Sequence, residues 1–333
     1  MPSLSLLLPV IFVLVGLGIL VWSANHFIDA TANIALQLNI SPLITGLIIV
    51  GFATSAPEII VGIKAAMENK IDLAIGNAIG SNIANIGLIL GLTAIFLSPI
   101  TIKSTAIKKI YILMFIAMFI PLASMLHGSD LSQFDGLILL SCLIISFFLL
   151  KKIAMNVGSD DPVNSQFSDE LDGINKKTKI RTFLILVMSF LALLLGASIF
   201  VDGAVDIAQF FGVSNLVIGL TIVAIGTSLP EIAASAASIM KKKADIAIGN
   251  IIGSNMFNML AVLGIPALIQ GSSINRLDPY IFMRDFTVMF ALTIMLAIML
   301  FGFKEVKLTQ AKGVVLLLCF MMYQYLIYKS IIG

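Results

Sequence analysis

Residues 41–91 read SPLITGLIIVGFATSAPEIIVGIKAAMENKIDLAIGNAIGSNIANIGLILG, and the chain carries this segment twice. It aligns without a gap to residues 214–264 at a constant offset of 173, and 25 of the 51 positions are identical. The identities include two polar motifs, T-S-x-P-E and G-N-x-x-G-S-N-x-x-N. A duplication of this length predicts two equivalent structural halves, each of which contains both motifs.

The composition around the repeat is that of a membrane protein. The 333 residues are 59% hydrophobic and only 11% charged, with a mean hydropathy of +1.08. A soluble domain carries about 25% charged residues, so this chain cannot form a charged surface of ordinary size. Soluble enzymes and nucleic-acid-binding proteins are thereby excluded, and membrane lipid is an expected partner.

Ten segments are long and apolar enough to cross a bilayer as helices, which needs about 20 residues each. They lie near residues 4–24, 41–67, 72–97, 107–127, 134–150, 182–204, 214–240, 245–269, 281–303 and 312–331. The predicted fold is therefore an all-α polytopic membrane protein with ten transmembrane helices. Its parts would be a five-helix half at 1–152, a cytoplasmic linker at 153–180 and a second five-helix half at 181–333. Because five is odd, the second half would be inverted in the bilayer, as in many secondary transporters.

Charge position predicts the orientation. Fifteen of the 20 Lys and Arg residues fall in connections on one side of the ten spans and five on the other. The positive-inside rule then places both termini outside a cell inner membrane. Asp29 and Asp202 are equivalent in the repeat, and we expect interfacial roles for them near the outer ends of their helices. Cys142 and Cys319 lie in apolar runs and are expected to be buried thiols without a disulfide.

Two carboxylates lie inside apolar spans, at the equivalent positions Glu58 and Glu231. A charge near the bilayer centre costs at least a few kcal/mol, so such a residue indicates a functional site. No Lys or Arg lies mid-span as a partner, so a bound cation is the expected counter-charge. Pro57 and Pro230 precede the two carboxylates and each frees a backbone carbonyl four residues earlier. Carbonyls, hydroxyls and carboxylates together form the all-oxygen environment that Ca²⁺ prefers.

The following helix of each half adds a polar stripe. Its residues recur at i, i+4 and i+8, which places them on one helix face. They are Asn77, Ser81 and Asn85 in the first copy and Asn250, Ser254 and Asn258 in the second. This face is expected to point toward the two glutamates. Hydrogen bonding between helices is an alternative role for the same side chains, and both roles are compatible.

These motifs resemble the two alpha repeats of the sodium/calcium exchangers, in the cation/calcium antiporter superfamily. The similarity is greatest to compact bacterial inner-membrane members with ten helices. Segments 41–91 and 214–264 would be the alpha-1 and alpha-2 repeats. The resemblance implies alternating access, in which one central region binds either Ca²⁺ or Na⁺. The first helix of each half, with its partner, would be the moving gate.

The resemblance also implies roles for single residues. Calcium would be bound by the carboxylates of Glu58 and Glu231 and by the backbone carbonyls of Thr54 and Thr227. Sodium would be bound by the hydroxyls of Ser55, Ser81, Ser228 and Ser254 and by the carbonyls of Gly51 and Ala224. Asn85 and Asn258 would flank the centre, with Asn77 and Asn250 beside them. No cofactor is implied, only transported Ca²⁺ and Na⁺, and a monomer would suffice, although the oligomeric state stays open.

One position departs from the family pattern. Sodium/calcium exchangers often have an acidic residue where this chain has Asn258. With two carboxylates, one Ca²⁺ is neutralised but three Na⁺ are not, so a Ca²⁺/H⁺ antiporter is the alternative to a Na⁺/Ca²⁺ antiporter that expels Ca²⁺. A channel would conduct without counter-flow. An intramembrane hydrolase would need a Ser–His dyad or paired aspartates at depth, which the spans do not offer, so we expect no enzyme.

Overall fold

The computed structural model describes residues 2–38, 40–69, 71–102, 104, 106–128, 131–156, 179–212, 224–270, 281–301 and 307–332. Nearly all of these residues are helical. Among the described residues, eight helices are long and apolar enough to cross a membrane, and a bent pair, Pro42–Thr54 with Ala56–Met67, would be a ninth span with an angle of 42°. The predicted span at 214–240 is described only from Ala224 onward, and most of the predicted linker lies outside the described residues.

The elements follow one another in this order: α1 (Pro2–Leu38), α2 (Pro42–Thr45), η1 (Gly46–Val50), α3 (Gly51–Thr54), α4 (Ala56–Met67), α5 (Ile71–Ala84), η2 (Asn85–Leu90), α6 (Gly91–Leu97), β1 (Ile100–Thr101), α7 (Ile107–Gly128), α8 (Gln133–Asn156), α10 (Lys179–Phe210), α12 (Ala224–Thr227), α13 (Leu229–Met240), α14 (Ala244–Phe257), η4 (Asn258–Val262), α15 (Gly264–Gln270), η5 (Ile281–Phe286), α16 (Thr287–Phe301), β2 (Lys307–Leu308) and α17 (Gln310–Ile332). The two short strands pair antiparallel. The η elements are π-helical turns.

Where both copies of the repeat are described, from Gly51 and Ala224 onward, they fold into the same series of elements. The bounds of α3 and α12, α4 and α13, α5 and α14, and α6 and α15 all differ by the sequence offset of 173. In each copy the helix breaks at the serine of the T-S-x-P-E motif, Ser55 or Ser228, and the proline is the second residue of the next helix. This placement is favourable, because a proline in the first turn has no hydrogen bond to lose.

A π-helical turn begins at the same repeat position in both copies. The turn η2 starts at Asn85 and η4 starts at Asn258. Such turns are rare, and they are frequent at functional sites because they rotate the following side chains relative to an ideal helix. The π turns therefore mark these two asparagines independently of the sequence motifs.

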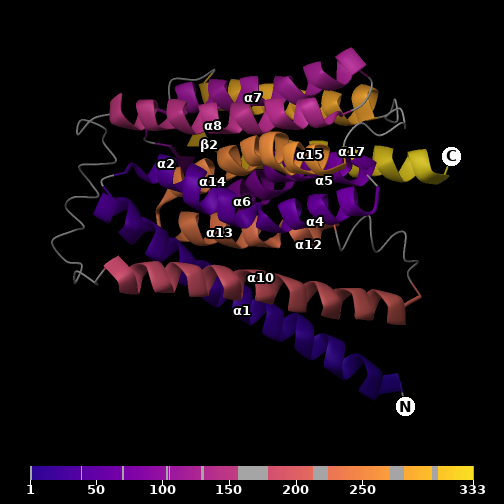
Figure 1. Cartoon of the computed structure of the whole chain (residues 1–333). Helices are drawn as coiled ribbons and strands as arrows, with labels where there is room; N and C mark the ends of the chain where they lie inside the picture. Colours follow the sequence, from indigo (N-terminus) through magenta and orange to yellow (C-terminus); the bar gives the residue numbers. More distant parts are fainter. Residues whose placement is uncertain are drawn as a thin grey trace.

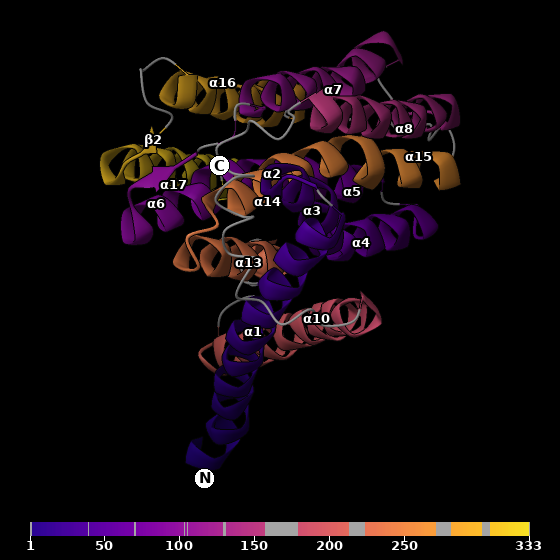
Figure 2. The same cartoon turned by 90° about the vertical axis from the view of Figure 1, so that its left-hand side faces the viewer.

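The helices α5 and α14 form the buried centre of the bundle, whereas α1 and α10 lie together beside it (Figures 1 and 2). Helices α1 and α10 are 37 and 32 residues long, well beyond the spans predicted at 4–24 and 182–204. A helix longer than the bilayer is thick accommodates the excess by tilting. Their backbones approach closely: a Cβ atom on Gly16 would lie 2.5 Å from the Phe200 nitrogen, and one on Gly203 would lie 2.6 Å from the Pro9 oxygen.

The cysteines differ in part from the prediction. Cys142 and Cys319 are free thiols, as expected, but both are half-buried rather than buried. They lie on α8 and α17, two of the outer helices, whose outward sides are not covered by protein. Apolar sequence around a residue therefore did not imply burial here, because lipid can cover such a residue instead.

Candidate cation site

The two glutamates lie in the first turn of helices that begin at the serine breaks. Glu58 is the third residue of α4 and Glu231 the third residue of α13, where the positive end of a helix dipole favours a carboxylate. Each residue is only 1% exposed. Both carboxylate oxygens of Glu58 and the Oε2 atom of Glu231 are buried without a hydrogen-bond partner. Ser81 lies beside the Glu58 carboxylate.

The two halves meet at this point. The Thr227 side chain of the second half lies beside the Glu58 carboxylate of the first, and Thr54 of the first half lies beside Glu231 of the second. Among the described residues, no three His, Cys, Asp or Glu side chains lie close enough together to hold a metal ion. A cation held between the glutamates would therefore obtain its other ligands from neutral oxygens.

Hydroxyl and amide groups connect the halves around Thr54. Its Oγ1 donates to Asn250 Oδ1 at 3.0 Å and lies 3.3 Å from Ser254 Oγ. Ser254 Oγ in turn donates to the Gly51 carbonyl oxygen at 3.4 Å, and Asn250 Nδ2 donates to Ser235 Oγ at 3.1 Å. Four of these five residues were predicted from the sequence, and Ser235 was not.

Four asparagines form a second connection, and its bonds obey the repeat. Asn85 Nδ2 donates to Asn255 Oδ1 at 2.9 Å, and Asn258 Nδ2 donates to Asn82 Oδ1 at 3.0 Å. These two bonds are equivalent under the offset of 173. The Oδ1 atoms of Asn85 and Asn258 are buried without a partner. Each of these two side chains thus uses its amide nitrogen in a contact between helices and leaves its oxygen without a partner, so the two expected roles are compatible.

The sequence prediction missed Asn82 and Asn255. Both are fully buried, and Asn82 Nδ2 also donates to the Asn255 backbone oxygen at 3.1 Å. The i, i+4, i+8 stripe omits them because they lie one position beyond its serines. Their identity in both copies of the repeat was the signal that could have found them.

The remaining predicted residues vary in position. The Oγ atoms of Ser55 and Ser228 are buried without partners. Asn77 is half-buried and donates to the Glu58 backbone oxygen at 3.5 Å. Ala224 is the first residue of α12, and its side chain lies outside the described part of the structure.

Another buried carboxylate provides a contrast. Asp285, in η5, is 6% exposed, and it accepts hydrogen bonds from Arg284 Nε at 2.6 Å and from the Tyr323 hydroxyl at 3.2 Å. Its charge is therefore compensated within the protein. Within the described part of the chain, neither glutamate forms an ion pair with an arginine or a lysine.

The expected position of Asp29 is wrong under the predicted orientation. Asp29 forms ion pairs with Lys241 at 2.9 Å and with Lys243 at 3.8 Å. These lysines belong to a connection assigned to the cytoplasmic side, so Asp29 lies on that side and not at the outer end of its helix. The prediction failed because α1 begins on the outer side in that orientation, so the C-terminal part of this helix, which contains Asp29, lies toward the cytoplasm.

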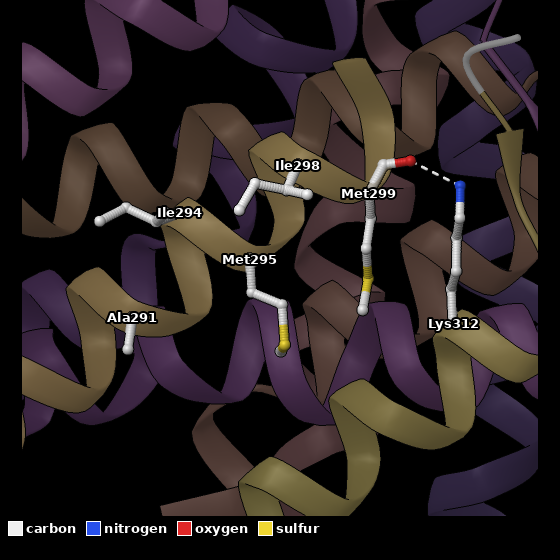
Figure 3. Close-up of a pocket in the computed structure, with 6 residues that line it drawn as sticks. All are labelled: Ala291, Ile294, Met295, Ile298, Met299 and Lys312. Atoms are coloured by element: carbon white, nitrogen blue, oxygen red, sulfur yellow. Dashed lines mark hydrogen bonds between the residues drawn. The ribbon is translucent and has the colours of Figure 1, made fainter. Parts of the chain in front are cut away.

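A groove between α16 and α17 is separate from the cation site (Figure 3). It has a volume of about 560 Å³ and is lined by Ala291, Ile294, Met295, Ile298, Met299 and Lys312. The Lys312 amine donates to the Met299 backbone oxygen at 2.5 Å, at one end of the groove. Apolar side chains form the rest of its wall, so this groove does not offer the oxygen ligands that a metal ion requires.

Comparison with known proteins identifies the family. The sequence matches the family described as sodium/calcium exchanger protein over residues 8–151 and 181–329. It is 42% identical to the proposed antiporter CaxA of Alkalimonas amylolytica over 98% of this chain and 100% of that protein. It is 29% identical to the sodium/calcium exchanger MaX1 of Methanosarcina acetivorans over 92% of this chain and 95% of that protein.

A solved structure shows the same fold. The sodium-calcium exchanger NCX_Mj, in crystals soaked with Na⁺ and Sr²⁺, superimposes with a TM-score of 0.77 at 28% identity. The match covers 95% of this chain and 98% of that one. The predicted resemblance is thus confirmed, and with it the prediction of a multi-pass membrane transporter of cations. The chain belongs to the sodium/calcium exchanger family, whose members are antiporters and not enzymes.

Proposed function

We propose that this protein exchanges Na⁺ for Ca²⁺ by alternating access and uses the sodium gradient to expel Ca²⁺. One observation carries the proposal: Glu58 and Glu231 are both buried, and three of their four carboxylate oxygens have no hydrogen-bond partner. An uncompensated buried charge is too costly to persist, so the pair requires a cation or protons. One Ca²⁺ carries the charge that neutralises two carboxylates.

In the calcium-bound state, the glutamates are the charged ligands. The backbone carbonyls of Thr54 and Thr227 supply neutral ones, and this assignment is supported by the position of each threonine beside the glutamate of the other half. Such a site draws on both halves equally. A movement of one half against the other therefore changes access to the cation without transferring it between sites.

Sodium uses the same region with more neutral oxygens. The proposed ligands are the hydroxyls of Ser55, Ser81, Ser228 and Ser254 and the carbonyls of Gly51 and Ala224. The unpartnered Oγ atoms of Ser55 and Ser228 support this assignment. Asn85 and Asn258 would flank the centre through their unpartnered Oδ1 atoms, and Asn77 and Asn250 would orient neighbouring groups.

The proposed architecture has ten spans in two inverted five-helix halves, 1–152 and 181–333, joined by a cytoplasmic linker at 153–180. The equal offsets of four pairs of elements support the two halves. The distribution of Lys and Arg supports a cell inner membrane location with both termini outside. A monomer surrounded by membrane lipid contains all the proposed ligands and would suffice.

A Ca²⁺/H⁺ antiporter is the second candidate, and one observation favours it. Asn258 stands where a third carboxylate is common, so the site holds two carboxylates only. Two protons would neutralise these groups as fully as one Ca²⁺ does. Sodium coupling with more than two ions would instead leave a positive charge in a buried site.

Transport by purified protein in lipid vesicles separates these functions. We expect Ca²⁺ movement to follow an imposed sodium gradient and to be absent in the Glu58→Gln variant. The matched control is Glu68→Gln, the same change at an exposed residue that follows α4. Movement driven by a pH gradient without sodium would instead establish proton coupling. Flux that ignores both gradients, or that survives Glu58→Gln unchanged, would refute antiport at this site.

A further inference from the structure

A cavity of about 300 Å³ lies between α10 and the two serine breaks. Ser198 and Asp202 line it from α10, while Pro57, Thr227 and Pro230 line it from the opposite side. The two prolines directly precede Glu58 and Glu231 in the sequence. The cavity thus borders the cation site of both halves.

Exposure changes along this cavity. Ser198 and Asp202, one helical turn apart on the same face of α10, are exposed, whereas Pro230 is buried. Thr227 is half-buried and lies beside the Glu58 carboxylate. The cavity therefore extends from Ser198 and Asp202 on α10 to Thr227, which lies beside the Glu58 carboxylate. Most of its other lining residues are apolar, and Asp202 is the only carboxylate among the described residues that line it.

The two repeat-equivalent aspartates have different surroundings. Asp29 is bound by Lys241 at 2.9 Å and by Lys243 at 3.8 Å. Within the described residues, Asp202 forms no ion pair or hydrogen bond, and no lysine or arginine lines the cavity beside it. The aspartate of the first copy is thus paired with lysine side chains, whereas the aspartate of the second copy is exposed beside the cavity.

We propose that Asp202 is a cation-recruiting residue at the mouth of this cavity and directs cations toward Glu58 and Glu231. The inference rests on the proposed function, because it assumes that cations bind there. A fixed negative charge at the mouth of an apolar passage raises the local cation concentration and the rate of entry. The attraction scales with ion charge, so Ca²⁺ is favoured over Na⁺. In this conformation Asp29 cannot act in the same way, because its carboxylate forms ion pairs with Lys241 and Lys243.

The test is the Ca²⁺ concentration for half-maximal flux, measured from each side of vesicles whose protein orientation is known. We expect Asp202→Asn to raise this concentration by about threefold to tenfold when Ca²⁺ is added on the membrane side of the C-terminal end of α10, near Asp202, at low salt, with the maximal rate unchanged. Asp202→Glu keeps the charge and should restore the wild-type value. Asp206→Asn is the control, since Asp206 lies one turn further along α10 and does not line the cavity.

Inert salt adds an independent readout, because screening should reduce the difference between Asp202→Asn and wild type. An unchanged half-maximal concentration, or a lower maximal rate with unchanged half-maximal concentration and salt dependence, would overturn the proposal. The comparison is made in whichever gradient drives the wild-type protein. If sodium drives nothing but protons do, the proposed sodium coupling fails while the role of Asp202 is still tested.

Discussion

Replacing Gly253 with alanine tests whether the contact of α14 with η1 holds the cation site together. A Cβ atom at this position would lie 2.1 Å from the Leu47 backbone oxygen, where ordinary contact begins at 3.4 Å. The atom in the way belongs to the Leu47 backbone, so it cannot move aside by a side-chain rotation. The two elements must therefore separate by about 1.3 Å, the difference between these two distances.

The expected loss is larger for transport than for stability. Overpacking costs about 1–3 kcal/mol, but alanine regains about 1 kcal/mol over glycine within a helix. Ser254, the residue after Gly253, bonds to Thr54 and to the Gly51 carbonyl oxygen on the adjoining α3; these two bonds are already 3.3 and 3.4 Å long and would break. At about 1 kcal/mol per bond, losing two of them weakens the assembled site by about 2 kcal/mol, or roughly 30-fold.

The assay combines sodium-driven Ca²⁺ flux with thermal unfolding of the purified protein. We expect Gly253→Ala to reduce flux at least tenfold while unfolding shifts only modestly. The control is Gly18→Ala on α1, where no described atom lies within 4 Å of the added carbon. Equal flux in the Gly253 variant and wild type would show that the cross-contact bonds do not determine site geometry.

Three further outcomes are expected. Adding Ca²⁺ at 100 times its dissociation constant should stabilise the wild-type protein by about 2.7 kcal/mol in thermal unfolding, and no Ca²⁺ stabilisation would argue against a preformed site. Asn258→Asp removes the donor to Asn82 Oδ1, so the metal-free protein should lose about 1–3 kcal/mol while the stabilisation by Ca²⁺ increases; unfolding with and without Ca²⁺ measures both. Asp29→Asn should lower the free energy of unfolding by less than about 1 kcal/mol, because the Asp29 side chain is 52% exposed and that of Lys241 is 27% exposed. High salt should remove this difference in thermal unfolding.

The sequence predicts most of this fold because hydropathy and repetition are both strong signals here. Apolar runs locate the helices, and the offset of 173 carries over to the bounds of four pairs of elements. The T-S-x-P-E motif predicts the break before Glu58 and Glu231, since proline and a buried charge each restrict the backbone. The lengths of α1 and α10 were not predicted, because helix continues past the apolar run wherever packing supports it.

The hydrogen-bond network was beyond the reach of sequence periodicity. The π turns at Asn85 and Asn258 change the direction of side chains, and no local propensity signals such a turn. Asn82 and Asn255 acquire their role from the helix that crosses opposite them, which is a tertiary property. Burial of Asp285 likewise depends on Tyr323, 38 residues later in the chain.

The close backbone contact of α1 with α10 also restricts how these two helices can move. One helix from each half takes part in this contact, where Gly16 packs against Phe200 and Gly203 packs against Pro9. Because the two backbones are so close, we expect α1 and α10 to move together. In the proposed alternating-access cycle, a movement of this pair would therefore change the surroundings of Asp202 and of Asp29 in the same step.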